Sequence, residues 1–352
     1  MKKNNFKNIG RLFLTLFIAV AFLSSCNNDD NGTSNQPPVI NSVSASVDQS
    51  GQPAPLTPTT IGYANNLYII QGSGFSTTKK VYFNDTEASF NPNFVTDSSI
   101  FVTINVNTPY ANASNKLKVV TDNGTAEFDF TVAPPAPILS SFNSINATTG
   151  DTITIYGNYF LNPIVTIGTT QATVVSSTLT QIQAVVPPGS FQKYVTVTTI
   201  SGSSTSTQAL GTAIYDDAAA PFVENYLGPW DGSGFVANTS IKVQGLSSIE
   251  ANFTGYTGFK FPMYGTPVAT AGYSGIRVSL KSTKETGKFK VVINNNYGAG
   301  KVITFNSNWS SFVIPFSDLG GAPATINEIV FQEFNNDGGD KLYIDDVGFV
   351  LN

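Results

Sequence analysis

The chain of 352 residues contains no histidine and a single cysteine. Histidine is the most common general base and metal ligand in proteins, so its absence leaves carboxylates, hydroxyls and amines for any catalysis. The single cysteine, Cys26, excludes an intramolecular disulfide. Charged residues make up only 12% of the chain, and helix-forming runs are scarce. Threonine, serine, asparagine and glycine abound instead, and this composition predicts short strands joined by many turns.

Residues 1–25 are predicted to be a signal peptide. Four basic residues precede the apolar run from Leu12 to Leu23, which is too short to cross a bilayer as a helix. The run ends in Leu23-Ser-Ser-Cys26, which resembles a bacterial lipobox, and this resemblance implies that Cys26 carries a lipid. Residues 26–36 then form a flexible tether. The alternative is an ordinary secretory signal in which the cysteine has no role.

The predicted mature chain is acidic. Cleavage before Cys26 removes four basic and no acidic residues, so the formal net charge changes from −5 to −9. This charge argues against nucleic acid and against anionic headgroups as partners. Asn27-Asn-Asp-Asp30 resembles the acidic export signal of Bacteroidetes lipoproteins, which implies a lipid anchor in the outer membrane and a chain that faces the cell exterior.

Residues 37–133 and 134–212 are predicted to be two copies of one β-sandwich. A strand that ends in glycine and is followed by phenylalanine recurs at an offset of about 85 residues, first before Phe75 and again before Phe160. We expect both phenylalanines in the core. The glycines, Gly72 and Gly157, are expected at bends that need a positive φ.

The shared pattern resembles the IPT/TIG family of immunoglobulin-like domains. The matching residues are Pro-x-Ile, then strand-Gly-x-x-Phe, then a strand that begins Val-x-Phe/Ile. The resemblance implies sandwiches of about seven strands that act as spacers. The proline-rich junction at 134–137 favours a semi-rigid link between the copies.

Residues 213–352 hold enough predicted strands for a jelly-roll β-sandwich. The segments Tyr215-Asp-Asp217, Trp309-x-x-Phe-x-Ile-Pro-Phe-x-Asp-Leu319 and Tyr343-Ile-Asp-Asp-Val347 resemble carbohydrate-binding jelly-roll modules. The order of modules behind a lipobox resembles the surface glycan-binding lipoproteins of Bacteroidetes polysaccharide utilisation loci. That resemblance implies an all-β protein that binds an extracellular polysaccharide and presents it to an outer-membrane glycan transporter complex.

Aromatic residues on glycine-rich loops are the predicted glycan contacts. A pyranose ring has an apolar face that matches a flat aromatic side chain and a rim of hydroxyls that matches polar groups. Trp230 and Tyr256 lie between glycines and rank first, whereas Trp309 precedes a strand and is expected in the core. The second-rank candidates are Tyr226, Tyr264, Tyr273 and Tyr297, together with the amides of Asn294-Asn-Asn296, of which Asn295 is the chosen contact.

Aspartates at the first and last strands of the C-terminal module suggest a structural Ca²⁺ site. Asp216, Asp217 and Asp345 are the predicted ligands, because the terminal strands of a jelly roll lie close together. Strict alternation sends Asp345 and Asp346 to opposite faces. The alternative interpretation is that these aspartates hold the ends of the sandwich together.

Catalysis is not expected. A glycosidase needs two carboxylates across a cleft, one with a raised pKa, and the sequence shows no such pair. Asp231, Glu224 and Glu250 are single carboxylates near turns. A surface glycoside hydrolase or lyase and a protein-binding adhesin remain the alternatives to glycan binding. The ligand class is expected to be a β-glucan-type chain, because a flat aromatic platform suits it.

Overall fold

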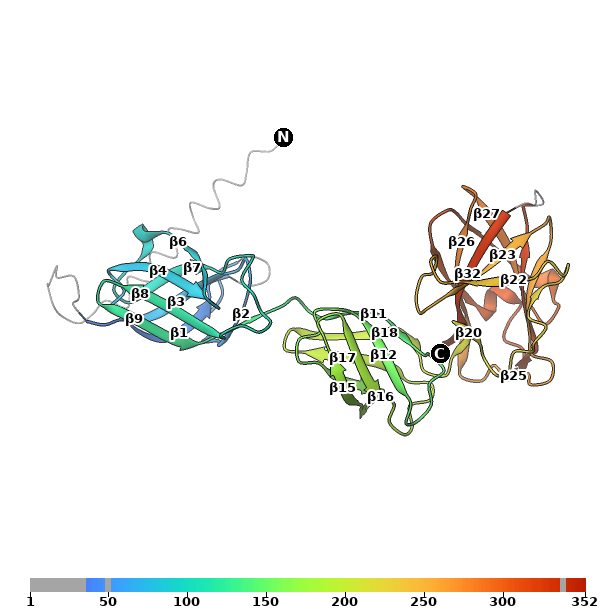
Figure 1. Ribbon diagram of the computed structural model, residues 1–352, viewed down its shortest axis with the longest axis horizontal. Helices are drawn as coiled ribbons and strands as arrows, with labels where there is room; N and C mark the ends of the chain where they lie inside the picture. The colour runs from blue at the N-terminus through green and yellow to red at the C-terminus, as the bar shows by residue number, and fades with distance from the viewer. Residues whose placement is uncertain (1–35, 48–51, 336–339) are drawn as a thin grey trace. The chain divides into compact units, whose positions relative to one another are not determined.

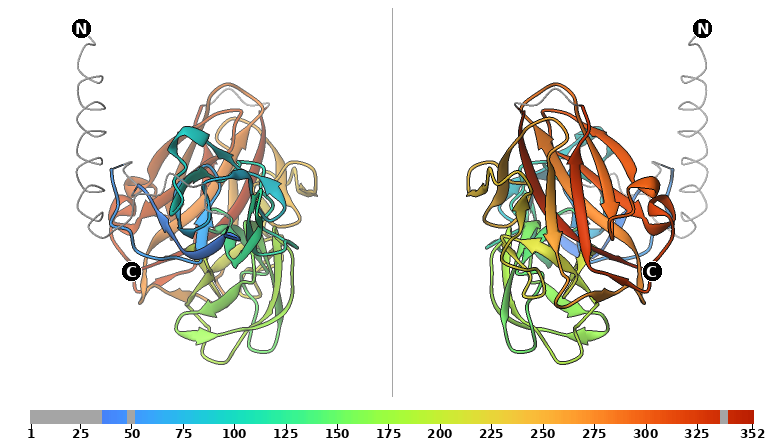
Figure 2. Two further views of the ribbon diagram at one scale, coloured as in Figure 1. Left: turned by 90° about the vertical axis from the view of Figure 1, so that its left-hand side faces the viewer. Right: turned by 90° about the vertical axis from the view of Figure 1, so that its right-hand side faces the viewer.

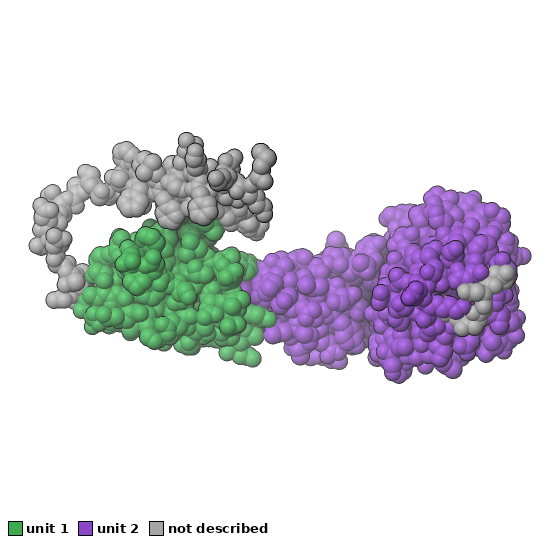
Figure 3. Space-filling model, turned by 90° about the horizontal axis from the view of Figure 1, so that it is seen from above, with its two compact units in different colours: residues 1–132 green, residues 133–352 purple. Residues whose placement is uncertain are grey.

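The computed structural model describes residues 36–47, 52–335 and 340–352. The predicted all-β class is confirmed: the only helical elements in these residues are three short 3-10 turns, namely η1 (Pro92–Phe94), η2 (Tyr297–Ala299) and η3 (Phe316–Leu319). Within the described ranges no helix has the length and hydropathy to cross a membrane. The predicted signal peptide and Cys26 lie outside the described residues. The chain divides into two compact units, Met1–Val132 and Ala133–Asn352 (Figure 3).

The first unit contains an immunoglobulin-like sandwich (Figure 1). One sheet has the order β1 (Val39–Ala45), β3 (Leu67–Ser73), β7 (Ser99–Thr103) and β6 (Ser89–Phe90). The other has the order β5 (Thr86–Glu87), β4 (Thr78–Phe83), β8 (Lys116–Thr121) and β9 (Gly124–Asp129), and β10 (Thr131–Ala133) pairs with β2 (Ile61–Tyr63). Apolar side chains from both sheets, including Phe75, Phe83 and Phe130, form its buried core.

The second unit begins with a sandwich of the same plan. One sheet has the order β11 (Ile138–Asn143), β12 (Thr152–Asn158), β16 (Gln181–Val185) and β15 (Thr173–Ser177). The other sheet has the order β14 (Thr170–Gln171), β13 (Ile164–Ile167), β17 (Tyr194–Thr199) and β18 (Gly202–Ala209). The pairing of the first strand has the same irregularity in both copies, because the register shifts between Ile40 and Ser42 in the pair β1–β3 and between Leu139 and Ser141 in the pair β11–β12. This shared bulge confirms the predicted tandem repeat.

Gly72 and Gly157 serve close packing and not a positive φ, so that part of the prediction is wrong. A Cβ on Gly72 would lie 1.9 Å from the Val39 carbonyl oxygen and 2.6 Å from the Phe75 ring. Gly157 is equally crowded by Ile138 and Phe160. Both phenylalanines are buried, as predicted. Glycine is therefore required because the ring passes directly over the strand, where any side chain would collide with it.

The C-terminal module is a sandwich of two sheets (Figure 2). The five-stranded sheet has the order β21 (Gly228–Pro229), β24 (Gly258–Pro262), β31 (Glu328–Glu333), β27 (Gly287–Ile293) and β28 (Lys301–Phe305). The seven-stranded sheet has the order β20 (Ala218–Ala219), β19 (Ala213–Asp216), β32 (Asp340–Leu351), β23 (Ser248–Phe253) and β22 (Phe235–Asn238). In the same sheet, β26 (Tyr273–Ser282) also pairs with β32, and β29 (Ser310–Pro315) pairs with β26. A short pair, β25 (Val268–Ala269) and β30 (Thr325–Ile326), completes the module.

Aromatic rings fill the space between these two sheets. Phe253 of β23 lies 6.4 Å from Phe259 of β24 and 5.3 Å from Phe289 of β27, measured between ring centroids. All three rings are buried in one continuous core. Burial of each ring stabilises the fold by about 1.5–3 kcal/mol. Because every second residue of these strands enters the core, the residues between them must form the two outer faces.

Candidate functional site

The outer side of the five-stranded sheet is the candidate site. Phe259 and Phe261 of β24 belong to the core, so the residues between them in sequence project away from it. The strand register then places residues of β31 and β27 in rows beside them. We call this side the outer face, and its central residues are Gly258, Lys260, Val330, Gln332, Lys290 and Val292.

Trp230 lies on the outer face, and its exposure agrees with its position on a glycine-rich loop. Its backbone N–H donates to the Gly258 carbonyl at 3.0 Å, which continues the pairing of β21 with β24. Its ring occupies the place that a Gly258 side chain would take, because a Cβ there would lie 2.4 Å from a ring carbon of Trp230. The indole is 42% exposed. The sheet therefore supports one side of the ring and leaves part of it open to solvent.

Hydrogen bonds fix the loop that carries Trp230. Asp231 accepts from the Ser233 backbone N–H at 2.9 Å and from the hydroxyls of Thr254 and Thr257 at 3.2 and 3.0 Å. These bonds, first those from Ser233, lower the pKa of Asp231. Thr254 and Thr257 belong to the turn that holds Tyr256, so the two aromatic loops are tied to each other. The indole is thus held ready before any ligand arrives.

Tyr256 is exposed at the same end of the outer face. Its side chain is 45% exposed, and its ring meets that of Phe334 edge-on, with 5.9 Å between centroids. Its backbone has a φ of 62°, a left-handed conformation that costs a residue with a side chain about 1–3 kcal/mol. The Glu333 carboxylate accepts from the Tyr256 N–H at 2.9 Å, and the Gln332 amide donates to its carbonyl at 3.1 Å. These bonds hold the strained backbone in place.

Three other predicted tyrosines surround Glu328 at the opposite end of the outer face. Glu328 is only 3% exposed, and its carboxylate accepts a short hydrogen bond from the Tyr264 hydroxyl. The Lys260 ammonium lies 3.1 Å from the same oxygen. Burial and this hydrogen bond raise the pKa of Tyr264. A buried carboxylate is therefore satisfied by one cation and one hydroxyl, both of which belong to the outer face.

Tyr226 and Tyr297 complete this group. A hydrogen bond to Glu224 raises the pKa of the exposed Tyr226 to about 12, and Glu328 contributes to the same rise. Burial, followed by the charge of Glu328, raises the pKa of the half-buried Tyr297. All three hydroxyls stay protonated at neutral pH. They can donate and accept hydrogen bonds, as recognition of sugar hydroxyls requires.

The carboxylates weighed as catalysts lack the environment of a general acid. The hydrogen bond with Tyr226 lowers the pKa of Glu224, and the one with Lys341 lowers that of Glu250. The pKa of Asp231 is lowered as well. The general acid of a glycosidase needs the opposite, a pKa raised towards neutrality. The outer face therefore offers stacking and hydrogen bonding without an evident proton donor.

The remaining candidates lie elsewhere. Tyr273 is buried in the core. Asn295 is exposed in the loop after β27, with a φ of 59°. The prediction that Trp309 is in the core is wrong: its ring is half-buried and lies 6.5 Å from that of Tyr343, outside the buried cluster. Tyr343 alternates with core residues of β32, so Trp309 belongs to the outer side of the seven-stranded sheet.

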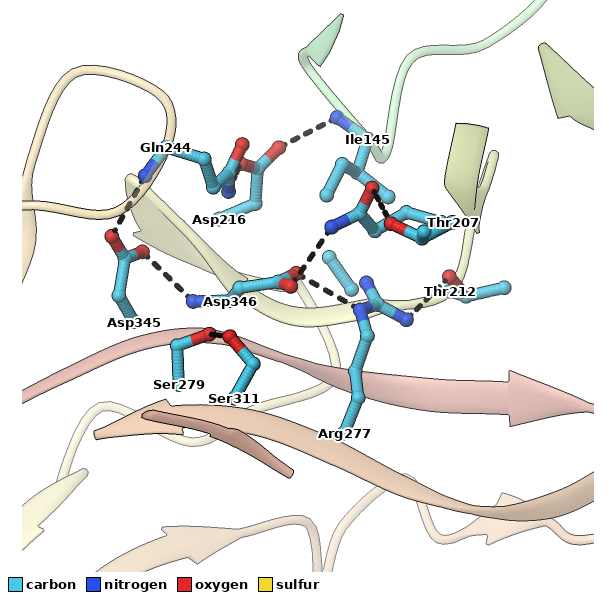
Figure 4. A network of polar contacts seen from close by, with 12 residues as sticks. Ile145, Thr207, Thr212, Asp216, Gln244, Arg277, Ser279, Ser311, Asp345 and Asp346 are labelled. Carbon is cyan, nitrogen blue, oxygen red and sulfur yellow. Dashed lines mark hydrogen bonds and ion pairs between the residues drawn. The ribbon is translucent and has the colours of Figure 1, made fainter. Parts of the chain in front are cut away.

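The terminal aspartates form a buried polar network with the preceding repeat (Figure 4). Asp216 accepts from the backbone N–H of Ile145 at 2.6 Å, and Asp346 accepts from the side chain of Gln208 at 2.9 Å. Arg277 of β26 donates to Asp346 at 2.9 Å and to the Thr212 hydroxyl at 3.0 Å. We call this network the joint. It ties the C-terminal module to the second repeat.

The other aspartates of this region also accept N–H groups. Asp217 accepts from the backbones of Leu246 and Ser247 at 2.6 and 2.8 Å and from the Asn143 side chain. Asp345 accepts from Val243 at 2.8 Å. Gln244 joins the two ends of the sandwich, because its backbone donates to Asp345 and its side chain to Asp216. Asp345 and Asp346 do not lie on opposite faces as strict alternation predicted, because a register shift and a positive φ at Asp346 interrupt it.

The oxygens expected to bind Ca²⁺ already accept hydrogen bonds within the protein. Calcium needs six to eight oxygen ligands, whereas these carboxylate oxygens already accept hydrogen bonds from N–H donors. Across residues 36–47, 52–335 and 340–352, no three acidic or other metal-binding side chains are grouped to hold a metal. Calcium binding through Asp216, Asp217 and Asp345 stays a prediction.

Sequence reasoning missed the residues that connect the predicted aromatics. Glu328, Phe334, Lys260 and Lys290 carry no local motif, and the first two are far in sequence from the tyrosines that they contact. The Lys290 ammonium lies 5.5 Å from the centroid of the Phe334 ring. The alternation of charged and apolar residues in β24 and β27 was the available signal, since it marks which side chains share the outer face.

Comparisons with known protein families cover both parts of the second unit. Residues 137–212 match the family described as "IPT/TIG domain", which confirms the predicted resemblance for the second repeat. Residues 230–352 match the family described as "Expansin-like protein C-terminal domain". An IPT/TIG domain-containing protein of Bacteroides ovatus is 31% identical over 157 residues, which is 43% of this chain and 31% of that protein. The chain thus spans about a third of that relative's length.

The solved structures that the chain matches include glycan-binding proteins. A surface glycan-binding protein from Prevotella bryantii has a TM-score of 0.49 and 16% identity, and the match covers 90% of this chain and 99% of that one. A family 11 carbohydrate-binding module from Clostridium thermocellum, in complex with a β-1,3-1,4-mixed-linked tetrasaccharide, has a TM-score of 0.30 and 18% identity. That match covers 40% of this chain and 94% of the module.

Proposed function

We propose that the protein is a cell-surface lipoprotein that binds an extracellular polysaccharide through the outer face of its C-terminal module. The observation that carries this proposal is the placement of the exposed aromatic residues. Trp230 and Tyr256 lie at one end of the outer face, and Tyr226 and Tyr264 lie at the other. Four exposed rings on one side of one sheet, separated by lysine, glutamate and glutamine, match the mixed apolar and polar surface of a sugar chain.

The length of the outer face suits a chain and not a single sugar. Gly258 and Pro262 are four positions apart in an extended strand, which corresponds to about 13 Å. Trp230 lies against the first of these residues, and Glu328 with its tyrosines is beside the second. A ligand that touches both ends must therefore contain several sugar rings. An unbranched β-glucan-type chain, which presents flat rings in succession, is the class that we propose.

The proposal extends to the cellular setting. A lipid on Cys26 would anchor the chain in the outer membrane, with the two repeats as spacers between the anchor and the C-terminal module. Binding at a shallow face gives modest affinity at one site, but many copies on one surface raise the overall avidity. The bound polysaccharide would then pass to an outer-membrane glycan transporter complex, and the protein itself would not cleave it.

The test uses the mature chain without its lipid, on a panel of soluble polysaccharides in affinity electrophoresis and calorimetry. We expect retardation by at least one neutral β-linked glucan, and loss of retardation in the double variant Trp230→Ala/Tyr256→Ala. Equal binding by the double variant would contradict the site. A reducing-sugar assay on the same mixtures separates a hydrolase or lyase from a binding protein, because product release would contradict the proposal that the protein only binds.

Labelled cells test the setting. Palmitate incorporation that depends on Cys26, together with antibody access in intact cells, is expected of a lipoprotein that faces the exterior. A chain that is secreted without lipid would contradict the anchor. A protein-binding adhesin would bind host or bacterial proteins and would not respond to any polysaccharide in the panel.

A further inference from the structure

We propose that Phe334 is a further glycan contact and that Glu333 positions it together with Tyr256. This inference rests on the proposed function, since it concerns the same outer face. Phe334 and Tyr256 come from different segments of the chain, and their rings meet edge-on at an interplanar angle of 72°. Together they form a corner at the end of the outer face, next to Trp230.

Phe334 has the exposure of a ligand contact. Its side chain is 37% exposed, although it lies one position beyond β31, and the phenylalanine within that strand, Phe331, is fully buried. The Lys290 ammonium lies 5.5 Å from its ring centroid. A ring that stacks on a sugar needs a neighbouring donor for the sugar hydroxyls, and Lys290 supplies one on the outer face. Two rings at a steep angle can contact the face and the edge of the same sugar.

Glu333 links the two segments that carry these rings. Its side chain is only 2% exposed, and burial of a carboxylate is costly unless strong donors surround it. One oxygen accepts from the Tyr256 backbone N–H at 2.9 Å, and the other accepts from the Asn335 backbone N–H at 2.6 Å. The Glu333 backbone also donates to Thr257 at 2.8 Å. The buried Glu333 side chain thus fixes the backbone of Tyr256, which carries one ring, and the backbone of Asn335, which follows Phe334 and its ring.

The strain at Tyr256 explains why such a positioning residue is needed. A left-handed φ of 62° would cost glycine nothing, and the neighbouring residue Gly255 shows that glycine is tolerated in this turn. A tyrosine at the strained position therefore has to be held there by its surroundings. The Glu333 bond to the Tyr256 N–H and the Gln332 bond to its carbonyl supply that restraint.

The test compares the glycan affinity and the melting temperature of single variants of the mature chain. Phe334→Ala is expected to weaken binding three- to tenfold with little change in melting temperature, because its ring is exposed. Glu333→Gln replaces one acceptor oxygen by a donor and is expected to weaken binding at least fivefold. Glu250→Gln is the matched control: its carboxylate also accepts bonds, from Asn238 and Lys341, but on the other sheet, so affinity should be unchanged.

A double variant separates positioning from general destabilisation. In the Tyr256→Ala background, Glu333→Gln should lower the melting temperature as before but change the affinity less than it does in the wild type. Full wild-type affinity in Phe334→Ala or Glu333→Gln would overturn the proposal, as would an equal loss of affinity from Glu333→Gln in both backgrounds. Failure of the proposed function looks different, because then the wild type binds no glycan or Trp230→Ala binds as well as the wild type.

Discussion

The outer sides of the two sheets in the C-terminal sandwich are both built from alternating strands, but they differ in what covers their side chains. On the seven-stranded sheet, Arg277, Asp345 and Asp346 are buried and their partners come from the protein itself. On the five-stranded sheet, Trp230 and Tyr256 are among the most exposed rings of the module. Residues of the second repeat bind the buried polar groups of the seven-stranded sheet, whereas the outer face of the five-stranded sheet leaves aromatic rings exposed to solvent.

This difference shows how an attachment surface can be told from a recognition surface. Buried polar groups need partners in the folded chain, so a face rich in them is an internal contact. The exposed part of an aromatic ring on a rigid loop is not buried by the fold, so a ligand can still bury it. Substitutions at the joint should therefore lower stability and leave affinity unchanged, whereas removal of an exposed ring from the outer face should weaken glycan binding.

The largest expected effect is on stability, in Arg277→Ala. This change leaves the buried Asp346 without its cation, and loss of one partner of a buried ion pair costs about 3–5 kcal/mol. Urea denaturation should show that loss in the free energy of unfolding, with unchanged glycan affinity in the folded protein. Lys301→Ala is the control, because its ion pair with Asp318 is exposed and should cost at most about 1 kcal/mol. Equal losses in both variants would contradict the distinction.

The second effect is a pH dependence from the same face. Burial raises the pKa of Asp345 from 3.8 to about 7. The folded protein therefore keeps a proton that the unfolded chain releases near pH 4, so the contribution of Asp345 to stability is fully present below pH 4 and is lost as the pH rises through 7. The shift corresponds to on the order of 4 kcal/mol at most. Thermal melts between pH 4 and 8 should show this decline in the wild type and a much flatter profile in Asp345→Asn.

The third comparison uses the two tryptophans, one on each face. Trp230→Ala should weaken polysaccharide binding by about 1–3 kcal/mol, by analogy with the loss of an aromatic side chain that stacks on a nucleobase. Trp309→Ala removes the same side chain from the opposite sheet and should leave affinity unchanged. Calorimetry of both variants with the same polysaccharide measures the two affinities. A loss of affinity in Trp309→Ala that matches that of Trp230→Ala would show that the seven-stranded face also binds glycan.

The fourth comparison concerns strain. Tyr256→Gly should raise the free energy of unfolding by about 1 kcal/mol, because glycine adopts the left-handed backbone freely, and it should still weaken binding. Tyr159 in the second repeat has nearly the same φ, 63°, and provides the matched control. Tyr159→Gly relieves the same strain but should leave affinity unchanged. If Tyr256→Gly binds normally, the Tyr256 ring is not a glycan contact.

The smallest effect tests the calcium prediction. If the terminal aspartates hold Ca²⁺, addition of CaCl₂ raises the melting temperature, and a chelator or Asp345→Asn removes the increase. An unchanged melting temperature would agree with the hydrogen bonds that occupy these oxygens.

The sequence by itself determined the all-β class, the tandem repeat and the exposure of Trp230 and Tyr256. Periodicity and turn residues are local properties, and glycine on both sides of a ring leaves little around it to bury it. The spacing of the repeated glycine and phenylalanine likewise predicted the buried rings of Phe75 and Phe160.

Only the tertiary structure decided which side chains meet. Glu328 binds Tyr264 across 64 residues of chain, and Glu333 holds Tyr256 across 77 residues. Trp309 was misplaced for the same reason, because the choice between core and outer side depends on which residues of its strand the other sheet covers. The role of the aspartates depended on the second repeat, whose Ile145 and Gln208 supply the donors. Partners so far apart in sequence leave no periodic signal, since their contact is set by sheet register and packing.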